Sequence, residues 1–167
     1  KNGKEIISKK NNIKLEKAII KSCKIKSRIV AKDEREQDLR MILNFGHTFA
    51  HGFEAAKKFS KKLNHGEAVL LGMIIASEIS TKKKLLSFKE LSQIKKHYFS
   101  LKLLMNIKKV FKKREINKIV YFMKKDKKNT GEKINLILLN KIGKATNPKQ
   151  IALNDDEIKK FLNSRYE

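Results

Sequence analysis

Residues 39–53 read LRMILNFGHTFAHGF, and this stretch decides the fold of the chain. Its apolar residues recur at three- and four-residue intervals, which predicts an amphipathic helix from Leu39 to about Lys58. The apolar face of this expected helix is formed by Ile42, Gly46, Phe49, Phe53 and Ala56. One continuous apolar face of this kind is typical of a helix that packs onto the core of a helical domain.

The opposite face of the expected helix carries Arg40, Asn44, His47 and His51, at spacings of four, three and four residues. A guanidinium and an amide can bind an anion, and imidazoles can bind a metal or transfer protons. Histidines can also act as hydrogen-bonded fillers on a polar surface inside a protein. The combination of these four side chains favours a functional site over that simpler interpretation.

The distribution of lysine also indicates a functional site in this region. The chain has 167 residues with 41 Lys and Arg, of which only five are arginine, yet residues 33–56 and residues 63–81 contain no lysine. These two windows hold three of the four histidines, His47, His51 and His65. Burial explains part of the lysine exclusion, but it does not explain why the histidines collect there.

A net charge of +24 invites the alternative of a basic helical module that binds nucleic acid. Proteins that recognise base edges usually depend on arginine, and single-strand binders place aromatic residues among the basic ones. Here the basic residues are mostly lysines spread along the chain, with no tryptophan and three tyrosines. A lysine-biased solvated surface is the favoured interpretation, so we expect no nucleic-acid partner.

The remaining composition predicts an intracellular protein without a membrane span. The longest apolar run, residues 68–76, is far shorter than the roughly 20 residues of a transmembrane helix. The single cysteine, Cys23, cannot form an internal disulfide, which favours a reducing cytoplasm. Because the sequence opens on Lys1 rather than methionine, we expect a fragment or a processed product.

The fold class expected is mainly α, with at most a small β-hairpin. Asn154 followed by three acidic residues predicts the start of a last helix. The seven glycines form no phosphate-binding loop, so no cofactor-binding residues for a dinucleotide are expected in this chain. The other expected elements are helices over Ile13–Val30, Glu67–Lys84, Phe88–Tyr98 and Lys113–Lys124, and a strand over Ile134–Leu139.

Two residues outside the second helix are also site candidates. His65 begins the third helix and could be a further metal ligand beside His47 and His51. Glu67 is expected to be either a helix cap or a group that contacts a ligand without binding the metal, and His97 lies among lysines and is expected at the surface. Lys26 lies within the apolar stripe of the first helix, where it can either extend to solvent or point into an anion site.

The sequence resembles a known family over this central block. The segment DEREQDLRMILNFGHTFAH at residues 33–51, followed by HGEAV at 65–69 and Gly72-Met73, resembles 3-dehydroquinate synthase. The resemblance is dense over residues 20–80 and continues weakly through Asp126-Lys127-Lys128 and Ile142-Gly143. The family usually has glycine where Ala50 stands and alanine where Gly52 stands.

The resemblance implies an activity and a domain arrangement. Enzymes of this family convert 3-deoxy-D-arabino-heptulosonate 7-phosphate to 3-dehydroquinate and phosphate in the shikimate pathway, using NAD+ and a divalent metal, zinc or cobalt. An amino-terminal domain holds most of the NAD+, and a helical carboxy-terminal domain holds the metal and much of the substrate. Residues 1–167 would be that second domain, and the amino-terminal NAD-binding domain of a cytoplasmic homodimer would be absent.

The same resemblance assigns roles to single residues. His47 and His65 would bind the metal with a third ligand, a glutamate in an upstream Glu-x-x-Lys segment that this chain lacks. His51 would be an acid–base group and Glu36 a second proton acceptor. Contacts to the substrate would come from Lys26, Arg40, Asn44 and one of Lys127 and Lys128. A related sugar-phosphate cyclase or a metal-dependent alcohol dehydrogenase is the alternative of the same class.

Overall fold

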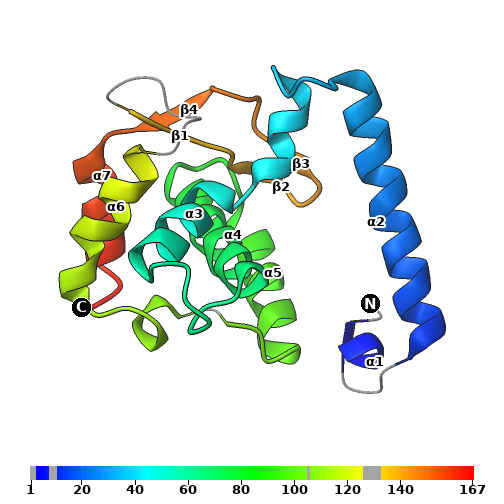
Figure 1. Cartoon of the computed structure of the whole chain (residues 1–167), viewed down its shortest axis with the longest axis horizontal. Helices are drawn as coiled ribbons and strands as arrows, with labels where there is room; N and C mark the ends of the chain where they lie inside the picture. The colour runs from blue at the N-terminus through cyan, green and yellow to red at the C-terminus, as the bar shows by residue number, and fades with distance from the viewer. Residues whose placement is uncertain (1–2, 8–10, 105, 126–132) are drawn as a thin grey trace.

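The computed structural model describes residues 3–7, 11–104, 106–125 and 133–167 (Figure 1). The mainly helical fold is confirmed. The α-helices are α1 (Gly3–Ile7), α2 (Asn12–Lys32), α3 (His47–Ala56), α4 (His65–Lys82), α5 (Phe88–Ser100), α6 (Ile116–Lys124) and α7 (Asp155–Asn163). The 3₁₀ helices are η1 (Leu39–Asn44), η2 (Ile107–Lys109) and η3 (Lys113–Glu115), and the strands are β1 (Ile134–Leu136), β2 (Leu139–Lys141), β3 (Lys144–Ala145) and β4 (Ile151–Leu153).

Helix α4 is the centre of the molecule, as its nearly continuous apolar sequence predicts. It packs against α3 and α5, and α3 packs in turn against α6. Phe49 and Phe53 of α3 and Leu71 of α4 are at most 1 % exposed. The helix begins two residues earlier than predicted, at His65, and Glu67 accepts a hydrogen bond from the backbone N–H of Asn64 at 3.0 Å. The capping role predicted for Glu67 is therefore confirmed.

The expectation of one continuous helix from Leu39 to Lys58 is wrong. The segment forms η1, breaks at Phe45 and Gly46, and continues as α3. Gly46 has a φ of +84°, in the left-handed region that favours glycine. At this break the chain lies against α4, since a Cβ built on Gly72 would stand 2.1 Å from the carbonyl oxygen of Gly46. A contact between backbones, invisible to helical periodicity, therefore ends the first part of the predicted helix.

The expected strand over Ile134–Leu139 is two short strands that belong to different pairs. β1 pairs with β4 in antiparallel register, and β2 pairs with β3 across a turn at Gly143, whose φ is +85°. Ile137 and Leu138 separate the two strands and are both buried. The β2–β3 pair is the small hairpin that the sequence allowed for. The β1–β4 pair was not predicted.

Helix α2 has the predicted position but stands to one side of the body in Figure 1. Asn11 caps it by accepting a hydrogen bond from the backbone N–H of Lys14 at 3.0 Å. None of its residues is buried. The large apolar residues that it exposes are Ile13, Leu15, Ile19, Ile20 and Ile25. Its apolar side therefore lacks the core contacts that its sequence is suited to make.

The later helices follow the sequence closely. α5 extends two residues beyond the predicted end, and η3 takes the first three residues of the predicted 113–124 helix. α7 begins after Asn154, whose side chain accepts the backbone N–H of Glu157 at 2.8 Å. His97 is exposed, as expected. None of the helices placed by the structure combines the length and hydrophobicity that crossing a membrane requires.

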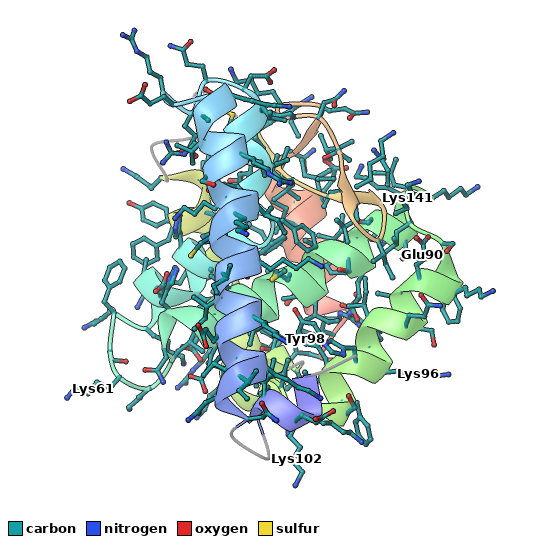
Figure 2. The ribbon with its side chains drawn as sticks, turned by 90° about the vertical axis from the view of Figure 1, so that its right-hand side faces the viewer. Lys61, Glu90, Lys96, Tyr98, Lys102 and Lys141 are labelled. Carbon is teal, nitrogen blue, oxygen red and sulfur yellow. The ribbon has the colours of Figure 1, made fainter. Side chains whose placement is uncertain are left out.

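Glu90 connects α5 to the β2–β3 hairpin, and the labelled Glu90 and Lys141 lie together in Figure 2. Its carboxylate accepts the Ser87 hydroxyl at 2.7 Å and the backbone N–H of Ile142 at 2.9 Å. These hydrogen bonds, the one from Ser87 foremost, lower the pKa of Glu90. Because the folded-state pKa lies below the unfolded one, the ionised carboxylate stabilises the fold above its ordinary pKa. That contribution is lost as the pH falls through the folded pKa.

We therefore expect Glu90→Gln to flatten the acid side of the stability profile. Between about pH 7 and about pH 3 the wild-type Tm should fall further than the Tm of the variant, because only the wild type loses this ionised carboxylate. Thermal unfolding followed by circular dichroism at several pH values measures the difference. Glu16→Gln, on the exposed surface of α2, is the matched control. Parallel wild-type and Glu90→Gln profiles would contradict the expectation.

Candidate functional site

A pocket of about 440 Å³ lies between α2 and the η1–α3 segment. Five of the candidate site residues from the sequence analysis line it. Its lining comprises Ser22, Ile25, Lys26, Glu36, Arg40, Leu43, Asn44 and His47. Lys26 is exposed and lines this pocket. Its role in binding an anion stays a prediction.

Asp33 organises the turn that carries Glu36 and Arg40 into this pocket. Its carboxylate accepts the backbone N–H groups of Gln37 at 3.0 Å, Asp38 at 2.9 Å and Arg40 at 2.9 Å. These hydrogen bonds, the one from Gln37 first, lower the pKa of Asp33. Glu36 has a φ of +55°, a left-handed conformation that a side-chain-bearing residue keeps only when its surroundings hold it there.

Glu36, Arg40 and Asn44 form one connected polar group. The Asn44 amide donates to the Glu36 carboxylate at 2.7 Å, and Arg40 Nε lies 3.9 Å from the same carboxylate. The Arg40 guanidinium also donates to the carbonyl oxygen of Glu34 at 2.7 Å. Lys26 of α2 also lines the pocket, which therefore contains two cations and one carboxylate and suits an anionic ligand.

A second pocket of about 310 Å³ adjoins the first and shares Glu36 and Asn44 with it. Its other lining residues are Arg35, Met41, Thr48, Asn135, Ile137 and Lys149. Glu36 and Asn44, joined by their hydrogen bond, therefore separate the two pockets. The site consequently extends from α2 towards strand β1.

Three histidines cluster at the edge of the first pocket. His47 is the first residue of α3, His51 follows one turn later, and His65 is the first residue of α4. The ring centres of His47 and His65 are 5.7 Å apart, and those of His47 and His51 are 6.0 Å apart. Two imidazoles bound to one tetrahedral zinc at about 2.0–2.1 Å have ring centres roughly 5 Å apart, so both pairs are slightly wider than a metal-bound pair.

The donor chemistry of this cluster fits a divalent transition metal, since imidazole nitrogen is a ligand of both zinc and cobalt. The part of the chain that the structure describes contains no group of three or more His, Cys, Asp or Glu side chains arranged to hold a metal. A complete ligand set would need at least one donor from elsewhere. Lys127 and Lys128, nominated for substrate contact, lie outside the described residues.

Residues 1–129 match the family described as 3-dehydroquinate synthase C-terminal. The chain belongs to this family. A 3-dehydroquinate synthase from Pelagibacter ubique is 47 % identical over 162 residues, which is 97 % of this chain and 43 % of that protein. One from Endomicrobium trichonymphae is 42 % identical over 132 residues, 76 % of this chain and 34 % of that protein. The chain thus spans less than half the length of these relatives.

Solved structures of 2-deoxy-scyllo-inosose synthase have a similar fold. One of them, complexed with carbaglucose-6-phosphate, NAD+ and Co²⁺, has a TM-score of 0.59 at 24 % identity, covering 77 % of this chain and 35 % of that one. Another has a TM-score of 0.68 at 22 % identity, covering 83 % and 37 %. These similarities support the mainly helical fold of the chain.

One residue of this 3-dehydroquinate synthase C-terminal domain was missed by the sequence analysis. Glu54 on α3 places a carboxylate oxygen 3.0 Å from Nδ1 of His65. A signal for it existed, because His47, His51 and Glu54 follow at spacings of four and three and share one side of α3. The contact with His65 itself depends on how α3 packs against α4, which spacing does not reveal.

Proposed function

We propose that this chain is the metal- and substrate-binding domain of a 3-dehydroquinate synthase. The full-length enzyme converts 3-deoxy-D-arabino-heptulosonate 7-phosphate to 3-dehydroquinate and phosphate. The observation that carries this proposal is the pocket that unites Lys26, Glu36, Arg40 and Asn44 with His47, close to His65. Cations, a proton acceptor and metal-binding imidazoles are the groups that this reaction requires from the protein.

Lys26 and Arg40 hold the anionic groups of the substrate in this proposal. They come from different elements, α2 and η1, and both line the pocket, so a ligand bound there can contact both cations. Asn44 adds an amide for a hydroxyl or a carboxylate oxygen. Fixed cations of this kind position a substrate and stabilise negative charge that develops during reaction.

His47 and His65 would hold a divalent metal, zinc or cobalt, together with a glutamate from the upstream part of the protein. When bound there, the metal polarises substrate hydroxyl and ketone oxygens. NAD+, held mainly by the amino-terminal domain, would supply hydride-transfer chemistry to the substrate. The protein residues then have the proton transfers to perform.

His51 and Glu36 serve those proton transfers. His51 lies beside His47 at a ring-centre distance of 6.0 Å, near the proposed metal but on the next turn of α3. The Glu36 carboxylate lines the pocket between Asn44 and Arg40 and can accept a proton from the substrate. Positioned acid–base groups typically contribute about 10²–10⁴ in rate.

The partner of this domain is the amino-terminal NAD-binding half of the same enzyme. Two features support a large missing partner: the length of the relatives and the exposed apolar residues of α2. A third is an apolar pocket of about 420 Å³ formed by α4, α5 and the β2–β3 hairpin, whose lining includes Met73, Ile94, Tyr98 and Leu139. We further propose a cytoplasmic homodimer, which the resemblance alone suggests.

This chain alone should therefore release no phosphate from the substrate when supplied with NAD+ and zinc. Activity should appear when the amino-terminal half of a relative, such as the Pelagibacter ubique enzyme, is co-expressed or fused to it. A coupled phosphate-release assay compares the two preparations. Turnover by the isolated chain would contradict the proposed division of domains.

The same assay separates the proposed substrate from that of a sister cyclase. The solved structural neighbour carries a hexose 6-phosphate analogue, which has no carboxylate. Because Lys26 and Arg40 provide two cations in one pocket, we expect activity with the carboxylate-bearing heptulosonate phosphate and none with glucose 6-phosphate. The reverse preference would assign the enzyme to another sugar-phosphate cyclase.

A further inference from the structure

Glu54 lies in the contact between the two helices that carry the histidines. It belongs to α3, and the His65 ring that it meets begins α4. Oε1 of Glu54 is 3.0 Å from Nδ1 of His65. The close approach of Gly46 and Gly72 and the buried side chains of Phe49 and Phe53 fix the packing of α3 on α4.

The surroundings of the two side chains differ. The Glu54 side chain is 14 % exposed, whereas the His65 side chain is 60 % exposed. A nearly buried carboxylate is costly unless a partner hydrogen-bonds to it. Among the described residues, His65 supplies that partner, so the carboxylate holds one particular nitrogen of the histidine ring.

This contact determines which nitrogen of His65 remains available. A neutral imidazole has one N–H donor and one nitrogen with a lone pair. A carboxylate can only accept, so the proton of neutral His65 resides on Nδ1 and the lone pair on Nε2. A carboxylate on the far nitrogen also makes the ligating nitrogen more basic and fixes the orientation of the ring.

We propose that Glu54 is a positioning residue that sets the tautomer and orientation of His65 and thereby presents Nε2 to the metal. This inference rests on the proposed function, because it takes His65 as a ligand. Glu54 itself does not touch the metal or the substrate. Its effect is transmitted through the imidazole, so removal of its side chain should lower metal affinity without removing a ligand.

The first test measures Co²⁺ affinity of the full-length protein by chelator competition and by visible absorption of the bound ion. Glu54→Ala should weaken binding by about 10–100-fold. Glu54→Gln keeps an oxygen that can accept the Nδ1–H, so its loss should be smaller. Glu16→Gln removes a carboxylate from the exposed surface of α2 and should bind Co²⁺ like the wild type.

The second test reads the tautomer directly in the metal-free protein, where activity plays no part. Imidazole ¹⁵N chemical shifts should show Nδ1–H for His65 in the wild type and in Glu54→Gln. In Glu54→Ala the proton should move largely to Nε2, the usual position in an unconstrained histidine. A purely structural ion pair would leave metal affinity unchanged when Glu54 is replaced by glutamine or alanine in a folded protein.

His65→Ala distinguishes failure of this inference from failure of the proposed function. If His65→Ala binds Co²⁺ as tightly as the wild type, His65 is not a ligand and the metal site proposed above is wrong. If His65→Ala loses the metal but Glu54→Ala retains full affinity and the Nδ1–H tautomer, the role of Glu54 is overturned. Loss of affinity in both variants, with the tautomer change in Glu54→Ala, supports both proposals.

Discussion

His47→Ala in the full-length enzyme should purify without metal and without activity, whereas His51→Ala should retain its metal and lose turnover. The two histidines are neighbours on α3, and their ring centres are 6.0 Å apart. The ring centre of His47 is also 5.7 Å from that of His65 on α4, and His47 lines the first pocket. Removal of one of three protein ligands should release most of the metal. Removal of an acid–base group typically costs about 10²–10⁴ in rate.

Elemental analysis of the purified variants, alongside phosphate-release kinetics, measures both quantities. His97→Ala is a suitable control for metal content, because His97 is exposed on α5. It should retain its metal. Complete metal loss by His51→Ala would mean that the site has three histidine ligands and that the proposed division of roles is wrong.

Five of the candidate residues line one pocket, although the single helix predicted to carry most of them is wrong. Arg40, Asn44 and His47 were expected on one face of a single helix. They come instead from η1 and α3, on either side of the break at Gly46. They still meet in one pocket, because the polar residues occur together in a short stretch and the core on the opposite side excludes them. The local spacing of the polar residues predicted which side chains lie together. The tertiary contact between Gly46 and Gly72 determines where the predicted helix breaks.

The lysine-free windows now have a structural explanation. Residues 33–56 form the Asp33 turn, η1 and α3, and residues 63–81 form nearly all of α4. One face of these elements is the core, and Glu36, η1 and the first residue of α3 also line the first pocket. A long cationic side chain would be buried in the core and would compete with ligands in the pocket. The absence of lysine from these windows therefore follows from burial in both and from the pocket lining in the first.

Contacts between separate elements could not be predicted from the sequence. The pairing of Glu54 with His65 requires α3 and α4 to be packed, and the turn held by Asp33 requires three backbone N–H groups to converge on one carboxylate. The family usually has alanine at the position of Gly52. Here a Cβ on Gly52 would lie 2.5 Å from Cγ of Met123, so α3 and α6 approach closely at this point.

Gly72→Ala should be among the most damaging small substitutions in the domain. The added Cβ would lie 2.1 Å from the carbonyl oxygen of Gly46 and 3.2 Å from the Cβ of Phe49. The nearest obstacle is backbone, so α4 and the η1–α3 junction must move apart. Overpacking of this kind costs about 1–3 kcal/mol, and occasionally more. Because this junction leads directly into His47, the same movement should shift the His47 imidazole away from His65 and from the first pocket.

We therefore expect Gly72→Ala to lower the free energy of unfolding in this chain, and to lower turnover of the full-length enzyme about 10²-fold or more, as misplacement of a group by 1 Å can do. Gly66→Ala is the matched control, six residues earlier on the same helix, where an added Cβ meets nothing within 4 Å. Alanine there should leave the stability of the domain unchanged or slightly raised, because glycine is the poorer helix former. Urea unfolding of both variants, with Co²⁺ titration of the full-length proteins, compares stability and site geometry. Equal stability and equal metal affinity in Gly72→Ala and wild type would show that the junction tolerates a methyl group, and that the Gly46–Gly72 contact does not hold His47 in place.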